Sequence, residues 1–418
     1  MIHPEIPGRS TRRSPDNALA EAVSLAHALN LDVAFDTVVK LRKPHAGMLF
    51  GKGKLEEIAA WLAAEDVELV LIDGPVSPIQ QRNLEKHWKV KVLDRTGLIL
   101  EIFGERARTR EGVLQVDLAA LEYQKTRLVR SWTHLERQRG TGGGIGGTVG
   151  GSGESQLESD RRAIDDAIVR LKKQLEKVEK TRNLHRAARA KVPYPIVALV
   201  GYTNAGKSTL FNTLTGADVM AKDMLFATLD PTMREVELPE GQKIILSDTV
   251  GFISELPTQL VAAFRATLEE VLDADLILHV RDISHAETQA QADDVRDILT
   301  TLGITERAQE HLIEVWNKID LLSEDKQETA LNQASRAESA LAVSATKGTG
   351  MDALLAGIES ALLDPMTTEV VRLAYAEGRR RAWLFAQNVV DHEEQDELGF
   401  LVTVTWTNKQ AAQFAKHG

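Results

Sequence analysis

The sequence predicts an α/β protein whose largest domain is a mixed, mostly parallel sheet with helices on both faces. Two observations indicate this fold class. Short apolar runs alternate with helix-forming stretches through residues 1–112 and again through 193–364, as in parallel sheets. Between them, two stretches with a seven-residue apolar repeat predict a long antiparallel helical hairpin. We therefore expect four parts: a small N-terminal α/β domain (1–112), the hairpin (113–192), the sheet domain (193–364) and a small α+β C-terminal domain (365–418).

Composition restricts the class of protein further. The chain has 418 residues, of which 43% are hydrophobic and none is cysteine, which excludes a disulfide framework, a thiolate zinc site and a cysteine nucleophile. No apolar run reaches the ~18–20 residues that a membrane helix needs, and residues 1–20 lack the apolar stretch of a secretory signal. We expect a cytoplasmic, monomeric protein and leave peripheral association with a membrane open.

The N-terminal part is expected to contain strands at 68–73 and 90–94 and helices at Lys54–Ala64 and Pro78–Trp88. Ser77 and Pro78 are typical of a helix N-cap and first turn. Just before the first helix, the stretch Gly51–Lys54 reads GKGK. It is either an ordinary helix entry, a contact for an RNA phosphate, or a second nucleotide site, for example for ATP.

The two hairpin helices each carry one apolar stripe, formed by Leu114, Leu121, Leu128 and Leu135 in the first and by Leu157, Ile164, Leu171 and Val178 in the second. Between them, Gly140–Gly153 contains nine glycines in 14 residues, so we expect the helix to be interrupted there. Residues 113–192 carry a net charge of +6, whereas residues 193–364 carry −16, within a total of −11. This polarity favours an RNA-binding arm over a simple coiled-coil spacer.

The strongest motif lies at the start of the sheet domain. The apolar run Ile196–Val200 leads into GYTNAGKS at residues 201–208, which matches G-x-x-x-x-G-K-S/T, and a helix-forming stretch follows at Thr209–Thr215. In such a strand–loop–helix unit the glycines let backbone N–H groups surround a β-phosphate. Lys207 is expected to neutralise the β- and γ-phosphate oxygens, and the Ser208 hydroxyl to ligate Mg²⁺.

Two further loops are expected to hold the metal ion and the γ-phosphate. The strand Lys243–Asp248 ends in a carboxylate that can hold the Mg²⁺ hydration shell, and the amide of Gly251 can sense the γ-phosphate. Before this strand, FATLDPT at residues 226–232 offers Thr228 and Thr232, one of which should complete the Mg²⁺ coordination. Spacing alone does not choose between the two threonines.

The next motifs specify the base. After apolar strands at 276–280 and 311–316, the chain reads NKID, in which Asp320 can accept hydrogen bonds from the N1–H and the exocyclic amine of guanine. Adenine does not offer these donors, so a buried carboxylate here predicts GTP rather than ATP. The stem of Lys318 is expected over the base, and Asn317 is expected to connect this loop to the phosphate loop. A final strand, Leu341–Thr346, supplies amides for guanine O6.

The C-terminal part begins near Asp364 and Pro365. Its pattern predicts a helix at about Thr368–Val390, a strand at Gly399–Thr407 and a terminal helix, and it points to no particular role.

Taken in order, the motifs resemble those of the HflX family of translational GTPases. GYTNAGKS, FATLDPT, DTVGF, NKID and SAT look like the family's GTPase motifs, and FGKGKLEEI, QQRNL, DRTGLILEIF and GESQLESDRR resemble stretches of its N-terminal half. The resemblance covers about residues 30–364. It implies a Mg²⁺-dependent GTPase that binds the large ribosomal subunit and splits stalled ribosomes under stress. It also implies that the glycine-rich tip is directed toward the peptidyl-transferase region, and that Thr228 is the threonine associated with Mg²⁺.

Position 252, directly after D-x-x-G, is phenylalanine, where many GTPases have a glutamine that orients the attacking water. Because Phe252 cannot hydrogen-bond water, we expect slow intrinsic hydrolysis, with the missing group supplied by a rearranged loop or by the ribosome. The alternative is that Phe252 packs in the core and that a neighbour such as Gln259 acts instead.

The expected site comprises the motif residues. The catalytic roles go to Lys207, Thr228 and Gly251, and the Mg²⁺ ligands are Ser208 and Thr228. The residues expected around GTP are Gly201, Tyr202, Thr203, Asn204, Ala205, Gly206, Lys207, Ser208, Thr209, Phe226, Ala227, Thr228, Leu229, Asp230, Asp248, Thr249, Val250, Gly251, Asn317, Lys318, Ile319, Asp320, Ser344, Ala345 and Thr346. The expected partners are GTP or GDP and rRNA of the large subunit, contacted by the basic hairpin. The alternative function is a GTP-controlled switch in ribosome assembly or RNA binding.

Overall fold

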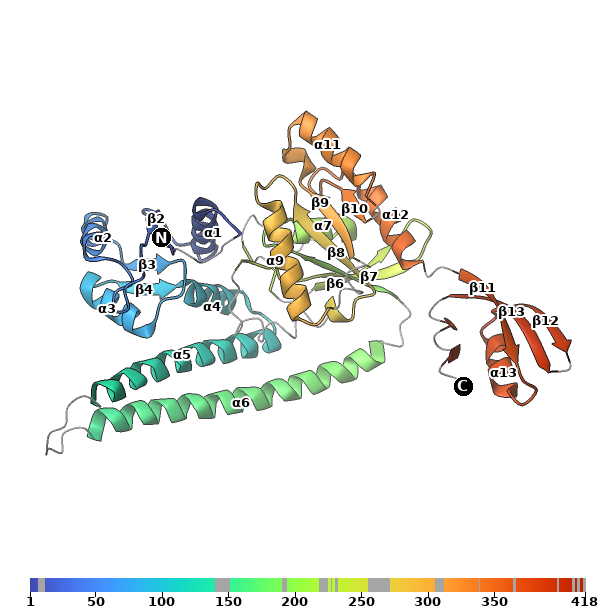
Figure 1. Cartoon of the computed structure of the whole chain (residues 1–418), viewed down its shortest axis with the longest axis horizontal. Helices are drawn as coiled ribbons and strands as arrows, with labels where there is room; N and C mark the ends of the chain where they lie inside the picture. The colour runs from blue at the N-terminus through green and yellow to red at the C-terminus, as the bar shows by residue number, and fades with distance from the viewer. Residues whose placement is uncertain are drawn as a thin grey trace. The chain divides into compact units, whose positions relative to one another are not determined.

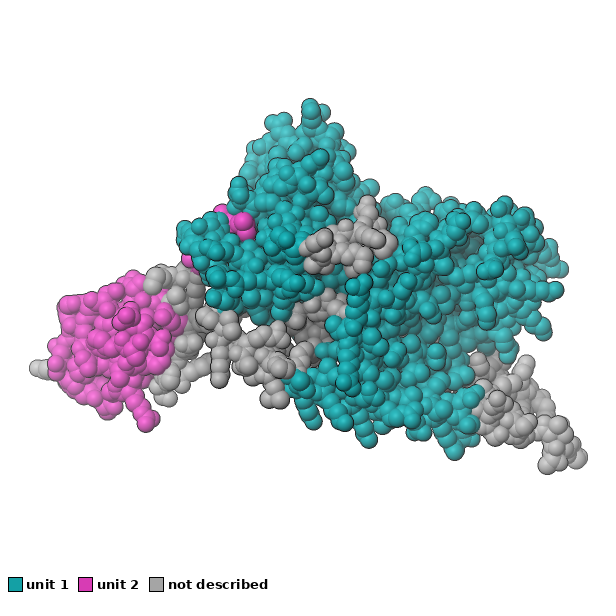
Figure 2. Space-filling model, turned by 180° about the vertical axis from the view of Figure 1, so that it is seen from behind, with its two compact units in different colours: residues 1–354 teal, residues 355–418 magenta. Residues whose placement is uncertain are grey.

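The computed structural model describes residues 1–6, 12–139, 151–189, 194–217, 225–226, 228–229, 232–254, 271–304, 312–337, 339–363, 366–396, 398–407, 410–411 and 414–415 (Figure 1). The chain forms two compact units, Met1–Leu354 and Leu355–Gly418, which are coloured separately in Figure 2. Within the described residues, no helix combines the length and the apolar character needed to cross a membrane.

The N-terminal domain is a four-stranded parallel sheet in the order β2-β1-β3-β4, with β1 Ile2–Glu5, β2 Thr37–Lys40, β3 Leu69–Ile72 and β4 Lys91–Asp94. Its helices are α1 Pro15–Ala28, α2 Lys52–Ala64, α3 Pro78–Trp88 and α4 Arg95–Arg106. Helix α3 has the predicted bounds because Ser77 and Gln80 form a reciprocal capping box ahead of it. The carboxylate of Asp94 caps α4 by accepting a 2.9 Å hydrogen bond from the Gly97 amide.

The predicted hairpin consists of α5 Arg110–Arg139 and α6 Gly151–Arg189. Lys125 pairs with Asp165, and Lys172 pairs with Glu122 at 3.2 Å, so the two helices run antiparallel side by side. In α6 the predicted stripe residues Ile164, Leu171 and Val178 are half-buried, and Ile168 and Leu175, which alternate with them at helical spacing, are buried.

One detail of the predicted glycine segment is wrong. The last three residues of Gly140–Gly153 already belong to α6, since packing of the long helix outweighs the cost of a few glycines at its first turn. The remainder, 140–150, lies outside the described residues.

The third part is a six-stranded sheet in the order β10-β9-β8-β5-β7-β6, parallel throughout except for β6, which is antiparallel to β7. Its strands are β5 Ile196–Gly201, β6 Thr232–Glu237, β7 Lys243–Asp248, β8 Leu276–Asp282, β9 Leu312–Asn317 and β10 Ala340–Ala342. Helices α7 Lys207–Thr215, α9 Thr288–Thr301, α11 Glu324–Ala334 and α12 Met351–Leu362 flank it (Figure 1). The predicted strand Leu341–Thr346 is shorter than expected, because Val343 to Thr346 leave the sheet as a loop.

The second unit corrects the prediction for the C-terminal part. The stretch expected as one helix, Thr368–Val390, is instead the end of β11 Met366–Leu373, then α13 Gly378–Ala386 and the start of β12 Val390–Asp396. Strand β13 Gly399–Thr407 was predicted correctly and lies between β11 and β12, antiparallel to both. The threonines and valines of β11 favour a strand once β13 is available as a partner. The predicted terminal helix falls mostly outside the described residues.

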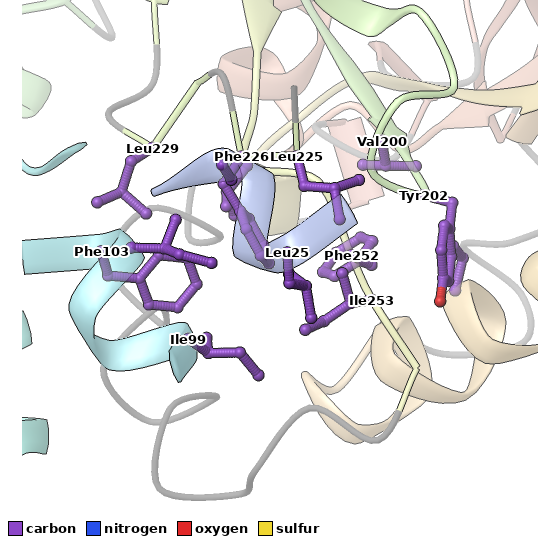
Figure 3. Packing of buried hydrophobic residues seen from close by; sticks show 14 of the residues in the cluster. Leu25, Ile99, Phe103, Val200, Tyr202, Leu225, Phe226, Leu229, Phe252 and Ile253 are labelled. Atoms are coloured by element: carbon purple, nitrogen blue, oxygen red, sulfur yellow. The ribbon is translucent and has the colours of Figure 1, made fainter. Parts of the chain in front are cut away.

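The N-terminal domain and the six-stranded sheet domain share one hydrophobic core. Leu25 of α1 and Ile99 and Phe103 of α4 belong to the same buried cluster as Phe226 and Phe252, which follow β5 in the chain (Figure 3). The rings of Phe103 and Phe226 meet edge to face with their centroids 4.7 Å apart. Two loops predicted to bind the nucleotide therefore have the N-terminal domain on their other side.

Candidate nucleotide-binding site

The phosphate loop connects the buried strand β5 to α7, and its glycines are sterically required. Gly201 has φ +154°, and a Cβ there would lie 2.2 Å from the carbonyl oxygen of Val280 in the neighbouring strand. Gly206 has φ +92°, and its Cβ would lie 2.2 Å from the side-chain amide nitrogen of Asn317. Asn204 between them is also left-handed, with φ +58°. This backbone is the tight turn into a helix N-terminus that the motif predicts.

The ammonium group of Lys207 lies inside this loop. Its Nζ donates hydrogen bonds to the carbonyl oxygens of Gly201 at 3.0 Å and Tyr202 at 2.8 Å. Burial lowers the pKa of Lys207 to about 8, against the opposing effect of the Asp248 carboxylate. A Cβ built on Gly251 would lie 3.0 Å from this Nζ, so the D-x-x-G loop and the lysine are neighbours, as the motif order predicts.

Three side-chain oxygens form the candidate Mg²⁺ site. The Ser208 hydroxyl donates to Asp248 Oδ2 at 2.7 Å, the Thr228 hydroxyl donates to the same oxygen at 2.9 Å, and the two hydroxyls are 2.8 Å apart. Asp248 Oδ1 is buried and accepts a hydrogen bond from none of the described residues. Burial raises the pKa of Asp248, in spite of Lys207 and the two hydroxyls. A hard cation that prefers oxygen ligands fits this set, since it would compensate the buried carboxylate.

The structure also distinguishes the two threonines that the sequence left open. Thr228 lies at the Ser208 hydroxyl, whereas Thr232 is the first residue of β6, where it pairs with Asp248 across the antiparallel strands. The geometry therefore supports Thr228, as the resemblance implies.

The predicted base-binding loops are connected through one amide. Asn317 at the end of β9 donates from Nδ2 to the Ala205 carbonyl at 2.9 Å, and its Oδ1 accepts from the Ala345 amide at 3.0 Å. It thereby ties NKID both to the phosphate loop and to SAT. Asp320 accepts from the hydroxyls of Ser344 at 2.6 Å and Thr346 at 3.4 Å, and its carboxylate has no cationic partner among the described residues.

The remaining predicted residues are either buried in apolar surroundings, engaged in polar contacts within the chain, located in the first turn of α7, or outside the described residues. Phe226, Leu229, Val250 and Ile319 are buried among apolar side chains, so only their backbone can face a nucleotide. Lys318 is left-handed at φ +66° and pairs with Asp282 at 2.9 Å, while the Thr249 hydroxyl donates to the Leu199 carbonyl at 2.6 Å. Thr209 lies in the first turn of α7. Ala227 and Asp230 lie outside the described residues, as does Gln259.

Sequence reasoning missed a polar cluster on the other side of the phosphate loop. We call it the Ser254 cluster; it consists of Arg13, Glu21, Arg95, Tyr202 and Ser254. Of these residues only Tyr202 belongs to a recognised motif. It stands at a position of G-x-x-x-x-G-K-S/T where any side chain is allowed, so the motif says nothing about its hydroxyl. A charged residue such as Glu21 in the middle of the apolar face of α1 is the one signal that the sequence contains.

The fold and these loops together define a P-loop GTPase, a class that binds GTP with Mg²⁺ and hydrolyses it. Comparison with known proteins agrees with this assignment. Family models match four consecutive stretches: "GTP-binding GTPase N-terminal" at 16–104, "GTP-binding GTPase Middle Region" at 106–189, "50S ribosome-binding GTPase" at 196–318 and "HflX C-terminal domain" at 329–417.

Two relatives that match over most of their length identify the family. The chain is 48% identical to GTPase HflX of Magnetococcus marinus, over 94% of this chain and 89% of that protein. It is 43% identical to GTPase HflX of Escherichia coli, over 91% of this chain and 87% of that protein. The chain belongs to the HflX GTPase family, and it is an enzyme that hydrolyses GTP. The family also includes the C-terminal part, which the motifs did not reach.

Proposed function

We propose that the phosphate loop binds GTP with Mg²⁺ held by Ser208 and Thr228, and with Asp248 behind them. Lys207 and the Gly251 amide would stabilise the charge on the γ-phosphate during hydrolysis. Asp320 would select guanine through its N1–H and exocyclic amine. The observation that carries this assignment is the convergence of the Ser208 and Thr228 hydroxyls on one buried carboxylate beside Lys207.

Intrinsic hydrolysis is proposed to be slow and to accelerate on the ribosome. Phe252 is only 1% exposed and packs in the shared core, as the alternative expected, so its side chain places no hydrogen-bonding group near an attacking water. Gln259, which the alternative named as the acting neighbour, lies outside the described residues. A single-turnover assay with purified protein tests this directly. Ribosomes should raise the rate at least tenfold, and fast hydrolysis without ribosomes would contradict the proposal.

We further propose that the protein binds the large ribosomal subunit and splits stalled or idle ribosomes under stress. The match to a model described as "50S ribosome-binding GTPase" supports the ribosome as partner. On the chain itself, helix α6 exposes a series of basic side chains: Arg161, Arg162, Arg170, Lys172, Lys173, Lys177 and Lys180. Together with the net charge of +6 over 113–192, they suit phosphate contacts with rRNA that weaken as salt rises.

The proposal keeps the four predicted parts, 1–112, 113–192, 193–364 and 365–418, as functional divisions of a cytoplasmic monomer. In this division the hairpin is the arm that contacts RNA, and the sheet domain is the GTPase. Gly51 is the N-cap of α2 and Gly53 lies in its first turn, which agrees with an ordinary helix entry at Gly51–Lys54.

Sucrose-gradient sedimentation of purified ribosomes tests the ribosomal function. Incubation with the protein and GTP, or a non-hydrolysable analogue, should convert whole ribosomes to subunits. Stable binding to one immature subunit without any conversion would favour the alternative, a GTP-controlled switch in ribosome assembly or RNA binding.

Variants of the hairpin separate the arm from the GTPase. Deleting residues 140–153 should abolish splitting and leave GTP affinity unchanged. The triple change Lys173→Glu, Lys177→Glu and Lys180→Glu should weaken subunit binding at least tenfold, because it removes three cations and adds three anions. Lys326→Glu, at an exposed lysine of α11, is the matched control and should have no effect. Unchanged splitting after the deletion would reject the arm.

A further inference from the structure

Ser254, three residues after Gly251, is bound through each of its polar groups. Its backbone N–H donates to the Tyr202 hydroxyl at 2.6 Å, and its carbonyl accepts from Arg95 at 3.0 Å. Its hydroxyl donates to Glu21 Oε1 at 3.0 Å and accepts from Arg13 at 3.1 Å. Residues of α1 and α4 in the N-terminal domain therefore hold the segment that directly follows the D-x-x-G motif.

The centre of the Ser254 cluster is the carboxylate of Glu21, which is 8% exposed. It pairs with Arg13 and Arg95, each at 2.5 Å, and accepts a short hydrogen bond from the Tyr202 hydroxyl. Burial by itself raises the pKa of Glu21, but Arg95, Arg13 and the tyrosine outweigh it, so the pKa lies below its ordinary value. The Glu21 carboxylate is therefore ionised near neutral pH, and the two guanidinium groups and the tyrosine hydroxyl hold it in one geometry.

The same segment is also hydrogen-bonded to the phosphate loop. The amide of Thr203 donates to the Phe252 carbonyl at 2.7 Å, and the amide of Phe252 donates to the Gly201 carbonyl at 3.1 Å. Gly251 packs so closely against the loop that a Cβ on it would lie 2.8 Å from Thr203 Cγ2. An amide of the phosphate loop and the Lys207 ammonium are thus both engaged with carbonyl oxygens of this chain.

A γ-phosphate competes with this arrangement. It needs donors from Lys207 and from the Gly251 amide, and it needs space between the two. Because a Cβ built on Gly251 would already lie 3.0 Å from the Lys207 Nζ, a γ-phosphate between the two is expected to displace Gly251. Ser254 lies only three residues after Gly251, at most about 10 Å of chain away, and Ile253 between them is fully buried. Movement at Gly251 is transmitted to Ser254.

We propose that the Ser254 cluster is a conformational coupling device: it holds the D-x-x-G loop against the phosphate loop, favours GDP over GTP, and is opened by the γ-phosphate. Ser254 and the Tyr202 hydroxyl are positioning residues in this scheme. Opening withdraws Ser254 from Arg95 on α4 and Glu21 on α1, so the N-terminal domain responds to the nucleotide. The inference rests on the proposed GTP site.

Tyr202→Phe tests the proposal with minimal disturbance. It removes the hydroxyl that accepts from Ser254 and Arg13 and donates to Glu21, and it keeps the buried ring, while Glu21 retains both arginines. Of the three lost hydrogen bonds, only the one from Ser254 restrains the loop after Gly251. The affinity for a fluorescent non-hydrolysable GTP analogue should increase about fivefold relative to GDP, as expected for one hydrogen bond of about 1 kcal/mol. Dissociation constants for the analogue and for fluorescent GDP are measured by titration.

Tyr123→Phe is the matched control. The hydroxyl of Tyr123 also lies in a carboxylate–arginine cluster, and its hydrogen-bond partners among the described residues, Asp94 and Arg127, belong to no nucleotide loop. Its loss should leave the ratio of the two affinities unchanged. Ser254→Ala is a second, independent variant that removes the hydroxyl contacts with Glu21, Arg13 and Arg95, and it should shift the ratio in the same direction as Tyr202→Phe.

The outcomes separate the coupling device from the GTP site. An unchanged ratio in both Tyr202→Phe and Ser254→Ala, or an equal shift for both nucleotides, would overturn the coupling device while GDP binding upholds the site. Failure of the unaltered chain to bind either nucleotide would overturn the GTP site and the device with it.

Discussion

Two buried carboxylates, Asp248 and Glu21, lie near the phosphate loop, and their pKa values are shifted in opposite directions. Asp248 is fully buried, its partners are hydroxyls and a lysine, and burial raises its pKa. Glu21 is nearly as buried, but it meets two guanidinium groups and a tyrosine hydroxyl, which lower its pKa. One oxygen of Asp248 has no donor among the described residues, whereas both oxygens of Glu21 are occupied.

The difference indicates that Asp248 is suited to binding a ligand, whereas Glu21 is suited to holding the protein's own elements in place. A carboxylate that the chain itself does not satisfy is suited to a cation that arrives with the substrate, since binding then relieves the cost of burial. A carboxylate that is fully paired within the chain instead fixes the position of the elements around it. The four predictions below test this contrast, from the largest expected effect to the smallest.

Replacing Glu21 by glutamine should lower the free energy of unfolding by about 3–5 kcal/mol, because it leaves Arg13 and Arg95 with too little negative charge in a buried site. Urea titration of the full chain measures the change. Glu158→Gln is the control: this residue pairs with Arg162 on the exposed surface of α6, and its loss should cost less than about 0.5 kcal/mol. Equal losses in the two variants would contradict the structural role of Glu21.

Asp248→Asn should lower activity rather than stability, the reverse of what is expected for Glu21→Gln. It keeps the size of the side chain but removes the charge that the metal ion needs, so kcat/KM for GTP should fall at least about a hundredfold, or about 2.7 kcal/mol. The free energy of unfolding without nucleotide should stay the same or rise, because the buried charge is gone. Steady-state hydrolysis and urea titration give the two values. Hydrolysis within twofold of the unaltered enzyme would show that Asp248 is not at the metal site.

Asp320→Asn should change the base that the site prefers. The carboxylate has only hydroxyl partners in this structure and is thereby available to the two donors of guanine. With an amide there, GTP affinity should fall by about 1–2 kcal/mol, whereas xanthosine triphosphate, which offers an acceptor in place of the amine, should bind better than GTP. Competition binding measures both. A parallel loss for the two nucleotides would indicate a merely structural role.

His279 gives the smallest effect. This buried histidine of β8 lies near Glu314, Arg281, Arg296 and Lys207, and burial is the main cause that lowers its pKa to about 3. The unfolded chain takes up the proton near pH 6.5, so stability falls as the pH drops below that value. From pH 7 to 5.5 this histidine should cost about 1 kcal/mol. His279→Leu should flatten that part of the pH profile in urea titrations, and an unchanged slope would contradict the assignment.

Much of the nucleotide site was predictable because its chemistry depends on backbone geometry that few residues permit. Gly201 and Gly206 have positive φ values and no room for a Cβ. Because only glycine fits at these two positions, the glycine spacing in the sequence predicts the backbone conformation of the loop. Asn317 likewise connects the loops that the motif order places together. The bounds of α3 followed from a local capping box.

Other features were not predictable because they depend on partners far away in the chain. The stretch Thr368–Leu373 was predicted to be helical and is instead part of a strand, because β13, which begins at Gly399, pairs with it. Glu21 and Ser254 are 233 residues apart and belong to no common pattern, yet their side chains lie 3.0 Å from each other.

The amino-acid sequence alone determined the class of enzyme and the order of its nucleotide-binding motifs, because phosphate and guanine recognition follow from local turns at strand ends. Only the tertiary structure decided which threonine joins Ser208, and that the loop after Gly251 ends in a charged cluster of the N-terminal domain. Contacts of that kind arise only when elements far apart in the sequence pack together, because a charge such as that of Glu21 is stable in a buried site only where partners from other elements meet it.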